Sequence, residues 1–143
     1  MSLKTRMIQT MLDAHAKTLV PALNQKLSAS FDYVINWACL PEDIAGWGWN
    51  DDDLKTCLHT SYFKPVEDAL QELFAQPMYR DAITTQLKRI KVEPGRETIS
   101  DWDIEGDALV VKNTLCANQL NGPDMYLAAA RNSIKQVIDS KLS

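Results

Sequence analysis

The sequence predicts an α+β fold: a helical N-terminal part, then a three-stranded antiparallel meander packed against a C-terminal helix. The spacing of the apolar residues supports this prediction because it changes twice along the chain. It is helical before Lys88, alternates as in strands from about 88 to 115, and becomes helical again after Pro123. The chain has 143 residues, the length of one globular domain, and we expect 1–143 to form a single one.

The first helical stretch has an apolar stripe that a proline interrupts. The stripe runs from Leu3 to Leu27 at helical spacing. Pro21 leaves two alternatives: a helix that ends near Thr18 and is followed by a second one, or one long helix with a kink. His15 lies on the same stripe, where a single histidine is more often a core or boundary residue than a catalytic base.

Residues 31–39 fit either a strand or a helix. Aromatic and aliphatic side chains occupy every second position of this stretch, as in a half-buried strand. The spacing of Phe31, Val34 and Ile35 would also suit one face of a helix. The aromatic and β-branched content favours a strand, which would join the meander.

The next segment has the signals of a loop followed by a helix start. Glycines on both sides of Trp47 indicate a loop. Asn50 before three aspartates is typical of a helix N-terminus, where a side-chain cap and negative charge are both favourable. The same acids could form a metal cluster, but adjacent carboxylates point in different directions and no further ligand is suitably spaced. Further helices are expected over 65–76 and 78–87.

The stretch from Asp101 to Lys112, DWDIEGDALVVK, resembles both a calcium loop and a β-hairpin. Its acids and Gly106 match the first half of an EF-hand loop, but Lys112 stands where the loop needs a glutamate. A hairpin with Gly106 and Asp107 as a two-residue turn places the apolar side chains on one face and Asp101 opposite Lys112. We therefore predict the hairpin and no metal site.

In the predicted meander, the strand that starts at Lys88 lies beside the acidic strand of this hairpin. This register places the bases Arg89 and Lys91 opposite two acids. The two acids are Asp101 and Asp103. Bases would then flank the acidic strand on both sides. We therefore expect the acids to form ion pairs between strands and not to bind a metal.

Composition and charge exclude several classes of function. A net charge of −4 and a pI near 5.1 disfavour binding to nucleic acid or to an anionic membrane. Charged residues in the first 17 positions argue against a signal peptide, and no run of 18 apolar residues occurs. Three cysteines, Cys39, Cys57 and Cys116, do not form a disulfide framework. We expect a cytoplasmic protein without a membrane or nucleic-acid partner.

No motif for catalysis or for a cofactor is present in the sequence. It has no glycine-rich phosphate loop, no zinc-protease motif and no serine-hydrolase motif. Cys57 and His59 are two residues apart on an expected helix, so their side chains point to different faces and cannot easily share a proton. We therefore predict no catalytic residues and no cofactor, and we do not favour an enzyme.

The remaining candidates are aromatic residues and the two histidines. Aromatic residues in loops either anchor a partner or fill the open end of a small core. The candidate binding residues are Trp47, Trp49, Tyr62, Phe63, His59 and His15. The favoured function is a protein-interaction or self-association module, with a protein partner or a homo-oligomer. The alternative is a small-molecule-binding domain or small enzyme with a pocket between helices and sheet, which uses His15 or His59 with an aspartate from 51–53.

Overall fold

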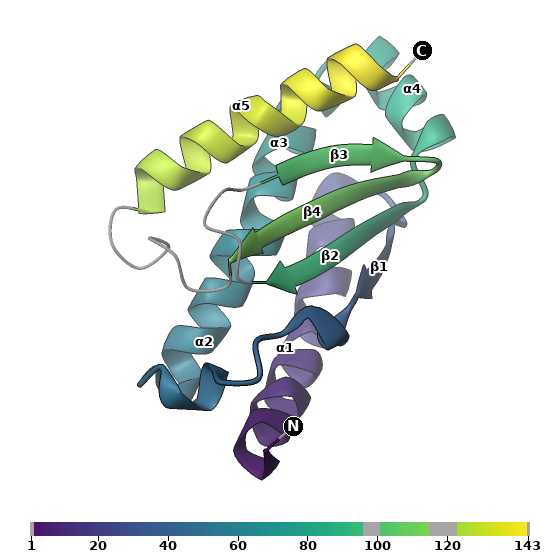
Figure 1. The fold of residues 1–143 in the computed structure, drawn as a ribbon. Coiled ribbons are helices and arrows are strands. Elements are labelled where there is room, and N and C mark those ends of the chain that lie inside the picture. The colour runs from purple at the N-terminus through teal and green to yellow at the C-terminus, as the bar shows by residue number, and fades with distance from the viewer. Residues whose placement is uncertain (1, 96–100, 115–122, 143) are drawn as a thin grey trace.

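The structure is a computed structural model that describes residues 2–95, 101–114 and 123–142. Figure 1 shows the α+β architecture that the sequence predicts. The helices are α1 (Leu3–Leu27), α2 (Asp51–Leu58), α3 (Lys64–Phe74), α4 (Pro77–Gln86) and α5 (Pro123–Lys141). The strands are β1 (Asp32–Ile35), β2 (Arg89–Gly95), β3 (Asp101–Glu105) and β4 (Ala108–Thr114). Short turns of helix are η1 (Trp37–Cys39), η2 (Ile44–Gly46) and the π-helical η3 (His59–Phe63).

The four strands form one mixed sheet in the order β1-β2-β4-β3. β1 is parallel to β2, β2 is parallel to β4, and β3 is antiparallel to β4. The predicted meander therefore needs a correction, because β4 and not β3 lies beside β2. The predicted hairpin is confirmed: Asp101 pairs with Lys112, and Glu105 pairs with Ala108. The calcium-loop alternative is thereby replaced by a β-turn.

The strand order follows from the side chains of β3 and β4. Residues 108–111 are four consecutive apolar residues, and all of them are buried. A strand that is buried on both faces belongs in the middle of a sheet. β3 alternates acids with Trp102 and Ile104, which suits an edge strand with one solvated face. Arg89 and Lys91 consequently lie beside β4, and the expected ladder with the aspartates of β3 does not form.

Acids of the hairpin have other basic partners. Arg89 binds Asp107 at 2.9 Å, and Lys141 of α5 lies 3.8 Å from Asp103. Both pairs are largely exposed, so each contributes little to stability. These acids of the hairpin therefore form exposed ion pairs at the surface of the sheet.

Helices cover one face of the sheet. Figure 1 shows α1 and α3 behind the strands, while α5 runs along β3. The strand residues buried on the covered face belong to the same core cluster as the helices, and they are Ile90, Val92, Trp102, Leu109 and Val111. The opposite face carries most of the charged strand residues, with Ala108 and Val110 of β4 buried at its centre, and it is the hydrated face of the sheet.

The N-terminal helices begin and end where local signals favour it. α1 is a single helix that contains Pro21, which decides between the two alternatives left by the sequence. The Asn50 side-chain oxygen accepts a hydrogen bond from the N–H of Asp53 at 2.8 Å and caps α2, as predicted. The strand expected within 31–39 is β1, which ends at Ile35 before η1.

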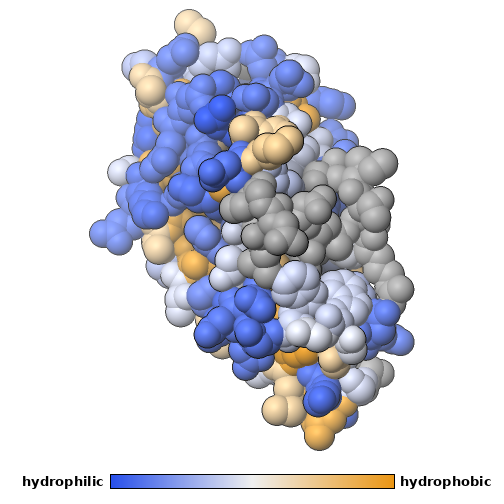
Figure 2. All heavy atoms as spheres, turned by 90° about the vertical axis from the view of Figure 1, so that its left-hand side faces the viewer, coloured by the Kyte–Doolittle hydropathy of each residue, from blue (hydrophilic) through white to orange (hydrophobic). Residues whose placement is uncertain are grey.

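One side of the molecule has a mostly hydrophilic surface. Figure 2 shows the side that lies to the left in Figure 1, and the described residues there are mostly hydrophilic, with separated hydrophobic areas. No helix in the described part of the chain is both long and apolar enough to cross a bilayer.

Candidate functional site

β1 forms an open edge of the sheet. Asp32 donates its N–H to the carbonyl of Lys88 at 3.0 Å, and Asn36 donates to Val92 at 2.9 Å. In a parallel ladder the direction of the backbone groups alternates from residue to residue. The N–H and C=O groups of Tyr33 and Ile35 therefore point away from β2, and no other described strand pairs with them.

A side chain already occupies one end of this edge. Phe31 precedes the strand, and its backbone groups also point away from β2. The Asn24 side-chain amide donates to the Phe31 carbonyl at 3.0 Å and accepts from the Phe31 N–H at 3.0 Å. This amide takes the place of a neighbouring strand at a single residue. At the other end the chain turns into η1, so the open edge comprises Tyr33 and Ile35.

The other edge of the sheet is protected. α5 packs along β3, where Ala130, Ile134 and Ile138 are buried, and Lys141 pairs with Asp103. Covering an edge with a helix is a common way to prevent unwanted strand pairing. Within the described residues, β1 is therefore the sheet edge that is free to pair.

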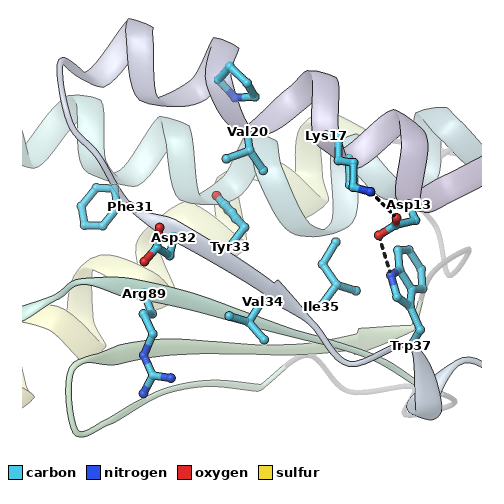
Figure 3. Close-up of a pocket in the computed structure, with 12 residues that line it drawn as sticks. Asp13, Lys17, Val20, Phe31, Asp32, Tyr33, Val34, Ile35, Trp37 and Arg89 are labelled. Atoms are coloured by element: carbon cyan, nitrogen blue, oxygen red, sulfur yellow. Dashed lines mark hydrogen bonds and ion pairs between the residues drawn. The ribbon is translucent and has the colours of Figure 1, made fainter.

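A groove of about 600 Å³ lies between α1 and β1. Figure 3 shows β1 crossing the view below α1, with Val20 and Tyr33 between the two elements. The α1 wall contributes Ala16, Val20 and Pro21, which are small or apolar. A strand placed beside β1 could therefore bury alternate side chains against α1.

A charged cluster forms one end of the groove. The Trp37 indole N–H donates to Asp13 at 3.0 Å, and Lys17 forms an ion pair with Asp13 at 3.2 Å. The hydrogen bond from Trp37, and secondly that from Lys17, lower the pKa of Asp13 below its ordinary value. Asp13 is thus held ionised and fixes η1 against α1.

Tyr33 lies with its ring in the interior and its hydroxyl group without a partner. Its ring packs on Phe63 with 4.6 Å between centroids. The hydroxyl oxygen is buried and forms no hydrogen bond with any described residue. Burial, and then the charge of Glu67, raise the pKa of Tyr33 far above its usual range. This phenol is therefore neutral.

The outer side of β1 presents an exposed apolar residue among charges. Val34 is 46% exposed on the hydrated face of the sheet. Asp32 and Asn36 share this face, and Asp32 lies in register with Arg89 of β2. Val34 is the midpoint of the open edge, because it stands between Tyr33 and Ile35.

The four aromatic residues that were candidate binding residues do not form one exposed surface. Tyr62 and Phe63 are buried, as the core alternative expects, and the Tyr62 hydroxyl donates to the carbonyl of Asn113 at 2.7 Å. Trp47 and Trp49 are partly buried and pack against the core. The four residues therefore contribute mainly to the interior.

The two predicted histidines lie in one neighbourhood, at the helical side of the molecule. Burial is the main cause that lowers the pKa of each, and the charge of His15 also lowers that of His59. No hydrogen bond joins either imidazole ring to another described residue. His59 lines a small pocket of about 100 Å³ with Lys26 and Glu67.

Glu67 is a buried carboxylate in the same neighbourhood. Its side chain is 6% exposed, and it forms ion pairs of 3.2 Å with Lys26 and with Lys64. These lysines neutralise a charge that would otherwise be costly to bury. The expected partner from the aspartates 51–53 does not appear, because those residues form the first turn of α2.

Metal-binding side chains do not gather in the described ranges. No three acids, histidines or cysteines there come together as a metal site. Cys57 is fully buried, and Cys116 lies outside the described residues. The open edge of β1 and the groove beside it consist of backbone groups and mainly apolar side chains, and need no such cluster.

Comparisons with known proteins do not assign a function. No protein-family model matches the chain, and neither the curated proteins nor the solved structures give a significant match.

Sequence reasoning missed the residues that define the edge. The alternation within 31–39 indicated a strand, but an edge position cannot be read from one strand alone. Asn24 gave no signal, since a polar residue near the end of a helix is common. Val34 was not among the candidate residues, because a single apolar side chain on the outer face of a strand gives no signal of a binding edge.

Proposed function

We propose that this protein is a non-catalytic interaction module that binds an extended segment of a protein by adding it to β1. The observation that carries the proposal is the open edge at Tyr33 and Ile35, next to a groove of about 600 Å³. Main-chain hydrogen bonds to such an edge provide affinity, and pockets for alternate side chains provide specificity.

The groove indicates what kind of segment fits. Side chains of an added strand alternate between the helical side and the hydrated side of the sheet. Those on the helical side would meet Ala16, Val20 and Pro21. Those on the other side would meet Val34 and the charges around it. The favoured ligand is therefore a short strand with apolar residues at every second position.

A small-molecule site at the histidines has less support. The pocket beside His59 has about 100 Å³, whereas pockets for drug-sized ligands have roughly 300–1,000 Å³. Its charged groups are also matched, because Glu67 has Lys26 and Lys64 as partners. If His59→Gln or His15→Gln abolished binding of a small ligand, this alternative would replace the proposal.

The test uses a phage-displayed library of random peptides and two variants at one position. Ile35→Pro removes the N–H that an added strand needs, while the ladder to β2 uses the flanking residues. Ile35→Ala keeps that N–H and serves as the matched control for loss of the side chain. Selected peptides should bind Ile35→Pro at least about tenfold more weakly than Ile35→Ala, as measured by fluorescence polarisation.

Two results would contradict the proposal. The first is equal affinity of the selected peptides for the two variants. The second is a map of amide chemical shifts in which bound peptide perturbs residues elsewhere and leaves Tyr33 and Ile35 unchanged. Thermal unfolding of both variants checks that the sheet is intact before binding is compared.

A further inference from the structure

We infer that the segment added to β1 is β1 of a second copy of this chain, in an antiparallel pair centred on Val34. The inference rests on the proposed function and names its partner. Pairing of two identical edges around a two-fold axis creates a closed dimer, the commonest form of homo-oligomer.

The free backbone groups select one register. In an antiparallel pair, residues whose groups face the partner form hydrogen-bonded pairs that exchange both N–H···O bonds. With Val34 at the axis, Tyr33 of one copy pairs with Ile35 of the other, and the converse pair forms by symmetry. All the free groups of both edges are then used.

Other antiparallel registers use residues that are already occupied. An axis at Asp32 or at Tyr33 requires Phe31, whose N–H and C=O are bonded to the Asn24 side chain. An axis moved to Ile35 or beyond requires Trp37, which belongs to η1 and not to an extended strand. The Asn24 amide and η1 therefore mark the two ends of a self-complementary edge.

The side chains at the axis are also compatible with this register. Two Val34 residues would stand directly opposite each other as a non-hydrogen-bonded pair, with Cα atoms about 4.5 Å apart. Each would cover a side chain that is 46% exposed in the single chain. Asp32 would lie opposite Asn36 of the other copy, so no like charges meet. An axis at Asp32 would instead oppose two carboxylates.

Symmetry places the two grooves together as well. A two-fold axis perpendicular to the sheet keeps α1 of both copies on the same side of the joined sheet. The groove walls would face each other across the axis. The charged end of each groove contains an acid, Asp13, and a base, Lys17. Two copies that approach each other therefore do not bring together charges of a single sign.

The experiment measures self-association by sedimentation velocity from about 1 µM to about 1 mM, a range that spans weak and moderate dimers. Val34→Lys and Val34→Glu each place like charges opposite each other at the axis, and the exposed position should tolerate both. Each variant alone should dimerise at least about tenfold more weakly than the unmodified protein. An equimolar mixture of the two variants should recover dimerisation, because lysine then faces glutamate.

Met78→Lys is the matched control. Met78 on α4 is an exposed apolar residue far from β1 in sequence and on a different element, and its replacement should leave the association constant unchanged. Recovery in the mixture separates pairing at Val34 from a general effect of charge on association.

The outcomes distinguish this inference from the proposed function. A protein that stays monomeric over the whole range, yet binds library peptides at β1, overturns the inference and leaves the interaction module standing. A dimer that both Val34 variants retain shows that another surface associates and also overturns it. Absence of both dimer and peptide binding overturns the two proposals together.

Discussion

Replacement of Tyr33 by phenylalanine is expected to stabilise the protein, which is the opposite of the usual effect of removing a buried hydroxyl. The Tyr33 hydroxyl is buried and has no hydrogen-bond partner in the described residues. A buried polar group without a partner costs about 1–3 kcal/mol. Phenylalanine removes this cost and keeps the ring contact with Phe63 at 4.6 Å. We expect a gain of about 1 kcal/mol, or a rise in Tm of a few degrees.

Tyr62→Phe provides the matched comparison, because the chemical change is the same and the environment differs. The Tyr62 hydroxyl donates to the Asn113 carbonyl at 2.7 Å, and its loss should cost about 1 kcal/mol. Urea unfolding of both variants, monitored by circular dichroism, gives the two changes in free energy of unfolding. If Tyr33→Phe destabilised the protein as much as Tyr62→Phe, the reasoning about the unpartnered hydroxyl would be refuted.

Three further measurements test the packing around the edge and the helices. Asn24→Ala should lower the free energy of unfolding by about 1–3 kcal/mol, since it loses two hydrogen bonds, and faster hydrogen exchange at the start of β1 should accompany this loss. Lys26→Met and Lys64→Met should each lower the free energy of unfolding only slightly in urea titrations. The double variant should lose more than the sum of the two single losses, because the Glu67 carboxylate is then buried without a partner. Additive losses would count against this coupling. The pKa of His59 is lowered by burial, so the unfolded chain takes up a proton that the folded one does not. Stability should fall as pH decreases below 6.5, until the folded pKa is reached, and His59→Gln should flatten that slope in urea titrations.

Local signals were sufficient to predict the class of fold and most elements. The Asn50 cap, the hairpin around Gly106 and the C-terminal amphipathic helix each depend on residues close in sequence. The order of the strands does not, and here the prediction followed chain order, which holds for about two thirds of consecutive strands. The continuous apolar run at 108–111 was the available sign that β4 is central, because strands with one wet face alternate.

The candidate site was harder to predict, because it consists of backbone groups. The selected side chains were aromatic or titratable, whereas the open edge is defined by what β1 lacks on one side. To predict the open edge, one must know that β2 pairs with one side of β1 and that Asn24 bonds to Phe31 on the other side. Both are long-range or irregular contacts that no periodicity encodes.

The parallel pairing of β1 with β2 also determines when the open edge comes into existence. Asp32 pairs with Arg89, 57 positions further along the chain, and three helices lie between them. Closing so long a loop is costly, so such contacts tend to form late in folding. We expect the edge to become available only after most of the helical layer has assembled. Chains that are still folding would then lack the surface through which they could pair prematurely.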